Sequence, residues 1–277
     1  MSLWKRTTVL AVSALTALAM TACGSTPGSD APEQPSVLEL LVSDLKGSLQ
    51  KTIEVTDKSD SVTVTMQGTA GGQKISVQGV VDLGDPVKAE MTTAGPDGTP
   101  TTVRMIGTAI YVEIPAEDRA STGGKRWMKL DLATVGEQAG MDFAKQLEDV
   151  DPTKQVKTLL ATEGVTVVGE ETVNGARTVH YAVTMPVATY LGQLDAGARS
   201  GVEQQLAKEG VKEVKIDLWV DEEYRPRRAG IVMGDMVDMT VDYTDYGKAV
   251  NIETPPPAET ADFAELLEGL KGLPTAN

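Results

Sequence analysis

The sequence of 277 residues is poor in cysteine, histidine and aromatic residues. Its one cysteine excludes an intramolecular disulfide and any site built from several cysteines. Its one histidine, His180, excludes a metal centre with several histidine ligands, so we expect neither a metal nor a cofactor. Aromatic residues make up 4% of the chain and include two phenylalanines, so the core must be built from aliphatic residues and the eleven methionines.

The chain also lacks positive charge, because 40 acidic residues stand against 25 basic ones and give a net charge of −15. Such a chain repels the phosphate backbone, and nucleic acid is therefore not an expected partner. Asp235, Asp238, Asp242 and Asp245 do not have the spacing of a calcium-binding loop, and we expect this acidic cluster to be a solvated strand face. A content of 41% hydrophobic residues is typical of a globular protein.

Residues 1–22 have the features of a secretory signal peptide. Lys5 and Arg6 precede an uncharged run of twelve residues, 9–20, and small residues follow before Cys23. Twelve residues span about 18 Å as a helix, less than the roughly 30 Å of a hydrocarbon core. The run is therefore predicted to be a cleaved signal and not a permanent membrane span.

Cys23, the only cysteine, stands where cleavage is expected. The segment ending there resembles the lipobox of bacterial lipoproteins, in which the cysteine becomes the lipid-modified first residue. Two or more acyl chains give stable membrane anchoring, whereas one gives marginal binding. Residues 23–35 have no apolar run and predict a flexible tether. We expect an extracytoplasmic protein anchored to the cell membrane through Cys23; a plain secretion signal with an incidental cysteine is the alternative.

Residues 36–277 predict a single α+β domain. Ser36 and Glu39 match a capping box, and leucines at helical spacing from Leu38 to Leu49 predict one helix of four turns. Apolar residues at helical spacing also predict helices at 132–147, at 156–160, at 186–206 with a break at 197–201, and at 263–270.

Alternation of apolar and polar residues predicts about ten strands with one apolar face. The alternating segments are 62–66, 75–81, 87–91, 103–105, 110–114, 127–131, 165–169, 179–183, 214–220, 227–233 and 237–243. Gly71-Gly72, residues 95–98 and Asn174-Gly175 have the composition of hairpin turns. Strands joined by such turns form an antiparallel meander, with the helices gathered on one side.

Several stretches resemble one family. They are Gly124–Asp131, the Asn174-Gly175 hairpin leading to Tyr181, Trp219–Asp221 followed by Arg225-Pro226, and Tyr243–Gly247. Together they resemble the actinobacterial lipoproteins of the LppX/LprG type, which share the fold of the LolA and LolB lipoprotein carriers. The resemblance covers most of residues 36–260. It implies a strongly curved antiparallel sheet, a half-barrel, with helices covering its concave side and acyl chains of a lipid or glycolipid held between them.

The resulting hypothesis is a lipoprotein that binds or carries a lipid or glycolipid in an apolar cavity and catalyses no reaction. An acyl chain of about sixteen methylenes costs roughly 13 kcal/mol in water, so carrying one requires an apolar enclosure. The predicted lining consists of inward-facing strand residues: Val64, Met66, Ile75, Val77, Met105, Val112, Val179, Tyr181, Val183, Ile216 and Leu218. The alternative is that these residues form a filled core. The protein would then be a non-catalytic interaction or sensor-associated envelope lipoprotein whose protein partner is unknown.

Catalytic chemistry has little support in the sequence. His180 lies in a predicted strand, on the face opposite Val179 and Tyr181, and no Gly-x-Ser-x-Gly motif is present. We therefore expect a surface histidine without a catalytic role. A hydrolase with a carboxylate pair assembled by the fold stays open, because such a pair is defined by distances in three dimensions.

Overall fold

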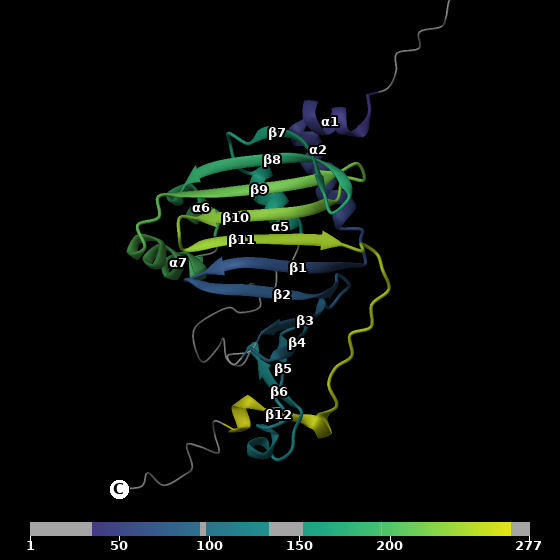
Figure 1. Cartoon of the computed structure of the whole chain (residues 1–277), viewed down its shortest axis with the longest axis vertical. Coiled ribbons are helices and arrows are strands. Elements are labelled where there is room, and N and C mark those ends of the chain that lie inside the picture. Colours follow the sequence, from purple (N-terminus) through teal and green to yellow (C-terminus); the bar gives the residue numbers. More distant parts are fainter. Residues whose placement is uncertain (1–34, 95–97, 133–151, 195, 267–277) are drawn as a thin grey trace, which may run out of the picture. The chain divides into compact units, whose positions relative to one another are not determined.

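The computed structural model describes residues 35–94, 98–132, 152–194 and 196–266 (Figure 1). These residues belong to one compact unit, Pro35–Asn277. None of the helices described there is long and apolar enough to cross a membrane. The predicted signal peptide and tether up to residue 34, nearly all of the predicted helix 132–147, and the end of the predicted helix 263–270 lie outside the described residues.

The unit is built on one twelve-stranded sheet. The strands are β1 (Ser61–Ala70), β2 (Gln73–Asp82), β3 (Lys88–Ala94), β4 (Pro100–Ile106), β5 (Ala109–Glu113), β6 (Trp127–Asp131), β7 (Thr166–Val173), β8 (Ala176–Pro186), β9 (Glu213–Asp221), β10 (Pro226–Met233), β11 (Val237–Thr244) and β12 (Thr260–Asp262). Their spatial order is β12-β6-β5-β4-β3-β2-β1-β11-β10-β9-β8-β7. All neighbouring pairs are antiparallel except β6 and β12. The α+β class and the curved, unclosed antiparallel sheet are thus confirmed.

Two of the three predicted hairpin turns are present, and the third, at residues 95–98, lies largely outside the described residues. Gly71 and Gly72 join β1 to β2 with φ values of 57° and 76°, and Asn174 and Gly175 join β7 to β8 with φ values of 49° and 82°. Left-handed backbone at both central positions is what a tight hairpin needs, and glycine and asparagine adopt it most readily. The strand that the sequence did not predict is β12, which has three residues and follows a run of prolines.

The first predicted helix is two helices, α1 (Val37–Ser43) and α2 (Leu45–Thr56). The capping box of Ser36 and Glu39 is confirmed. The chain breaks at Asp44, which ends α1 and whose carboxylate accepts the N–H of Gly47 at 3.0 Å as the N-cap of α2. An aspartate side chain can accept a backbone N–H in place of a helical carbonyl and so interrupt a helix. The spacing of the leucines gives no sign of such an interruption.

Further helices are α5 (Thr153–Leu160), α6 (Val187–Gly192), α7 (Ala196–Lys208) and the short η1 (Arg119–Thr122). Residues 263–266 are helical as well, in agreement with the start of the predicted helix 263–270. The predicted break at 197–201 is wrong, because α7 runs through it; the helical run is interrupted earlier, at residues 193–194 after α6. Arg199 explains the position of the break: its guanidinium donates to the carbonyls of Gly192 and Leu194 at the end of α6. Glycine in an exposed helix costs only about 1 kcal/mol, so Gly201 does not end α7.

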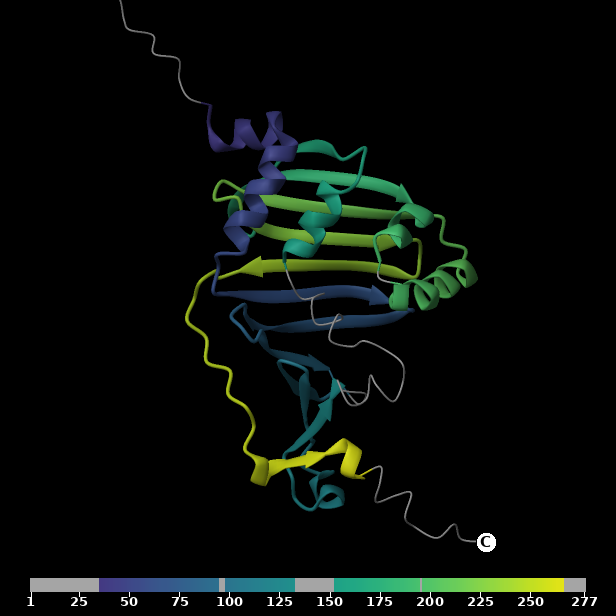
Figure 2. The same ribbon diagram turned by 180° about the vertical axis from the view of Figure 1, so that it is seen from behind.

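Helices α1, α2, α5, α6 and α7 lie over one face of the sheet, seen from behind in Figure 2. Apolar residues of α1, α2, α5, α6 and α7 join a core with strand residues of that face; the helical members are Leu38, Leu41, Leu49, Val156, Leu159, Leu191 and Leu206. We call this concave, helix-bearing side the inner face and the other side the outer face. The prediction that helices cover the concave side is confirmed.

Two glycines allow strands to approach closely where the sheet bends. A Cβ atom at Gly68 would lie 2.0 Å from the carbonyl oxygen of Asp238, and one at Gly79 would lie 2.1 Å from that of Glu90. Gly68 also has a φ of 151°. A side chain at either position would force the neighbouring backbone to shift, so both positions favour glycine.

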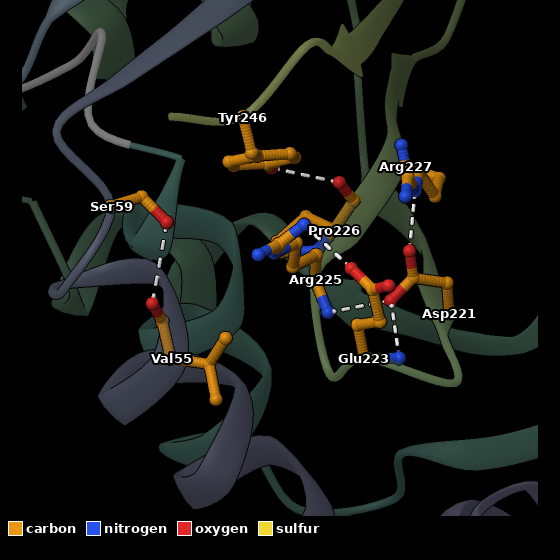
Figure 3. Close-up of polar contacts among 8 residues, drawn as sticks. All are labelled: Val55, Ser59, Asp221, Glu223, Arg225, Pro226, Arg227 and Tyr246. Carbon is orange, nitrogen blue, oxygen red and sulfur yellow. Dashed lines mark hydrogen bonds and ion pairs between the residues drawn. The ribbon is translucent and has the colours of Figure 1, made fainter. Parts of the chain in front are cut away.

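The turn between β9 and β10 is held by Asp221 and anchors the chain beyond β11 (Figure 3). The Asp221 carboxylate accepts the backbone N–H of Arg225 at 2.9 Å and the guanidinium of Arg227. Tyr246 donates its hydroxyl to the carbonyl of Pro226 at 2.8 Å, and the Arg225 guanidinium lies 5.6 Å from its ring centroid. Burial raises the pKa of Tyr246 well above its ordinary value. From this anchor the chain runs to η3 (Pro257–Glu259) and β12 at the far edge of the sheet (Figure 2).

Candidate functional site

The eleven residues predicted to line a cavity all lie on the inner face. Directly opposite residues of an antiparallel pair share a face. Leu218 stands opposite Tyr181, Met66 opposite Val77, and Val112 opposite Val103. Further pairs carry the same face continuously from β8 to β6. The two-residue period therefore assigned the face correctly.

Burial divides these residues into two groups, and the first lies under the helices. Its members, which we call the covered region, are Val179, Tyr181, Val183, Ile216 and Leu218. Each is 4% exposed or less, and Val64 is also buried. α1 and α6 pack on β8, and α5 and α6 pack on β9. The covered region is therefore part of the packed core.

Tyr181 ties the covered region to the first helix. Its hydroxyl donates to the carbonyl of Leu41 in α1 at 2.7 Å, and the side chain is fully buried. Burial raises the pKa of Tyr181 far above its ordinary value, since the charged phenolate would lose its hydration. The tyrosine thus acts as a structural link between sheet and helix.

The second group lies on β2–β6 and remains partly accessible. We call it the open region: Ile75, Val77, Met91, Val103, Met105, Ile110, Val112, Met128 and Leu130. Eight of these side chains are half-buried and Val112 is 36% exposed. Met66 of β1, half-buried, lies opposite Val77 at the border of the region. The open region continues the apolar inner face beyond the covered region, and Met91 and Met105 pack against the edge of the core.

Five residues of the open region were not among the predicted lining residues. They are Met91, Val103, Ile110, Met128 and Leu130. The signal for them was present, because each lies in a predicted strand and alternates with outward-facing residues. Met91, Met105 and Met128 give the region three unbranched, polarizable side chains that adapt to ligands of irregular shape. An apolar surface of this kind can bind hydrocarbon and offers no group for acid–base chemistry.

His180 lies on the outer face, as predicted, but it is 8% exposed and the expected surface position is wrong. Its Nδ1 lies 2.9 Å from Oε1 of Glu171 in β7, and its Nε2 lies 2.7 Å from Oδ1 of Asp217 in β9. The ring stacks on Trp219 with centroids 4.1 Å apart. Neighbours on both adjacent strands therefore cover it, which a single strand's pattern does not reveal.

This cluster is structural in character. Both nitrogens of His180 contact carboxylates, so neither is placed against a nucleophile. Hydrogen bonds from Trp219 and then from His180 lower the pKa of Glu171. Within the described part of the chain, no group of three histidine, cysteine or acidic residues is arranged to hold a metal ion.

Comparison with known proteins gives the family. No protein-family model matches the chain. A candidate lipoprotein of Streptomyces coelicolor, SCO4650, is 31% identical over 95% of this chain and 96% of the relative. A 31.2 kDa Streptomyces griseus protein from the rplA-rplJ intergenic region is 31% identical over 80% of this chain and 76% of its own length. The chain belongs to this lipoprotein family.

A solved structure extends the comparison to the fold. The lipoprotein LppX of Mycobacterium tuberculosis superposes with a TM-score of 0.51 at 18% identity, over 76% of this chain and 98% of LppX. The chain therefore shares the fold of LppX, in agreement with the sequence resemblance to the LppX/LprG type.

Proposed function

We propose that this lipoprotein binds or carries a lipid or glycolipid on its inner face and catalyses no reaction. The observation that supports this most directly is the open region, nine apolar side chains on five adjacent strands that keep access to the surroundings. Soluble domains normally bury such strand faces, and an apolar surface left accessible favours a binding role.

The same contrast supports a proposed position for the ligand. The covered region is filled by α1, α5 and α6, so an acyl chain would lie along β2–β6, against Val77, Met105 and their neighbours. Each methylene transferred from water onto such a surface contributes about 0.8 kcal/mol. Of the eleven predicted lining residues, the proposal retains Met66, Ile75, Val77, Met105 and Val112 as ligand contacts.

We further propose that the protein is extracytoplasmic and anchored through lipidated Cys23. A chain with a net charge of −15 is repelled by anionic headgroups, so stable attachment needs acyl chains. Cys23→Ala should release the protein into the culture medium, measured by fractionation and immunoblotting. Cys23→Ala protein that stays in the membrane fraction would show that the anchor lies elsewhere.

The binding test uses the full chain carrying Cys23→Ser, expressed in an actinobacterial host. Lipid extraction and mass spectrometry should find a co-purifying lipid, and a fluorescent fatty-acyl probe should bind saturably. Val77→Trp places an indole in the open region and should weaken probe binding by at least about tenfold. Val80→Trp is the matched control, since Val80 is also a half-buried valine of β2 but faces outward.

Two results would overturn the proposal. One is the lack of both a co-purifying lipid and probe binding. The other is equal weakening by Val77→Trp and Val80→Trp, which would place the probe away from the inner face. The alternative, a non-catalytic interaction protein with a filled core, would then stand in its place.

A further inference from the structure

A recess lies on the outer face, at the end of the sheet that residues 254–266 reach. It is a cleft of about 660 Å³ between β5–β6 and residues 254–266. Tyr111, Lys129 and Asp262 form a row along its wall, because Tyr111 stands opposite Lys129 and Lys129 opposite Asp262 in the strand register. β5, β6 and β12 lie side by side in Figure 1. Neighbouring strands are about 4.8 Å apart, so the row spans about 10 Å.

Lys129 supplies the row with a hydrogen-bond donor that lies near two carboxylates, Asp262 in the row and Asp131 on the same strand. Nζ of Lys129 lies 3.8 Å from carboxylate oxygens of both Asp131 and Asp262. These separations are longer than a direct hydrogen bond, so the ammonium keeps N–H groups for another acceptor. The hydroxyl of Tyr111 makes no hydrogen bond with the described residues and can donate or accept.

The opposite wall is apolar and is held in place. Pro255, Pro257 and Leu266 contribute its carbon surface. Lys125 fixes this wall by donating from Nζ to the carbonyl of Ala258 at 2.7 Å. The backbone N–H of Arg126 donates to the carbonyl of Glu259 at 2.9 Å, and β12 pairs with β6. The cleft therefore exists before any ligand arrives, which lowers the cost of binding.

We infer that this cleft binds a neutral saccharide. Lys125 and Lys129 are balanced by Asp262 and Glu265, so the site gives no net attraction to an anion or a cation. Adjacent sugar hydroxyls both donate and accept, which suits an ammonium beside a carboxylate, and the apolar wall suits the C–H face of a ring. The volume lies within the usual range of small-molecule sites.

The inference is independent of lipid binding, because Tyr111 and Lys129 face away from the open region. It is tested by titrating the Cys23→Ser full chain with neutral trisaccharides of glucose, mannose, galactose and N-acetylglucosamine. Binding is measured by saturation-transfer NMR and calorimetry. At least one trisaccharide should bind saturably, and Lys129→Met should weaken it by about tenfold.

Lys88→Met is the matched control. Lys88 is also an outer-face lysine, 34% exposed against 31% for Lys129, and its Nζ lies 4.0 Å from Asp82. Lys88→Met should bind like the parent chain, and Tyr111→Phe should weaken binding severalfold with an unchanged unfolding transition. The inference is overturned if no trisaccharide binds at 10 mM (roughly the weakest affinity a small polar site gives). Equal weakening by Lys88→Met, or saturable binding of sulfate in place of sugar, would also overturn it.

Discussion

The covered and open regions of the inner face have similar apolar side chains but different surroundings. In the covered region, helices pack on the strands, and Tyr181 and Leu218 are fully buried. In the open region, the same alternation continues through Val77 and Leu130, yet these side chains stay half-buried. An apolar strand face is thus one physical feature with two uses. The element packed against it decides whether it stabilises the fold or remains available to a ligand.

The largest expected effect is on the free energy of unfolding, and it is tested by truncating one leucine in each region. Leu218→Ala removes a fully buried side chain beneath the helices and should lower the free energy of unfolding by about 3–4 kcal/mol. Leu130→Ala makes the same truncation in the open region and should cost about 1 kcal/mol, because less contact is lost there. Denaturant unfolding of both variants measures the gap. Equal losses would mean that the open region is as tightly packed as the core.

An intermediate effect concerns the close approach of β2 and β3, where the open region begins. Gly79→Ala would place a methyl group 2.1 Å from the backbone of Glu90 and should cost about 2–3 kcal/mol. Gly230→Ala is the control, because its nearest neighbour would lie at 3.6 Å and the free energy of unfolding should change by less than about 0.5 kcal/mol. Thermal unfolding compares the two. If Gly79→Ala left the unfolding temperature unchanged, the pairing of β2 with β3 would not depend on this close contact.

The smallest effect lies on the outer face and depends on pH. Folding lowers the pKa of Glu171 below its ordinary 4.5, chiefly through the hydrogen bond from Trp219. The ionised carboxylate therefore adds to the free energy of unfolding in full above pH 4.5. This stabilisation is lost as pH falls through the lowered pKa of Glu171. Between pH 7 and pH 3, the Tm of Glu171→Gln should fall by about 2 °C less than that of the parent chain.

Glu163→Gln is the control for this pH experiment. Glu163 is exposed in the turn before β7, and its replacement should leave the acid response unchanged. If the Glu171→Gln variant lost stability in acid as the parent chain does, the ionised Glu171 would not contribute to the stability of the His180 cluster. The conclusions on the covered and open regions would not change.

Local patterns predicted much of the fold because their causes are local. The Ser36 capping box and the Asn174-Gly175 turn depend on a few adjacent residues, and both are present. The break at Asp44 was missed, since a side chain accepting one N–H outweighed the leucine spacing. β12 was missed because three residues gain strand geometry only by pairing with β6, more than a hundred residues earlier in the chain.

The candidate site was predicted in part. Alternation placed all eleven lining residues on the inner face, but it could not separate Leu218 from Val77, whose local patterns are alike. Likewise, it placed His180 on the outer face without revealing that Glu171 and Asp217 cover it.

The amino-acid sequence by itself determined which segments of β1–β11 are extended and which face of each is apolar, and it supplied the lipobox-like segment at Cys23, because these depend on near neighbours and on period. Only the tertiary structure decided which part of the apolar face is packed and which is accessible. That division depends on which strands the helices pack against, and these strands are distant from the helices in sequence. The outer cleft has the same origin, because residues 254–266 form its wall only after crossing to the far edge of the sheet.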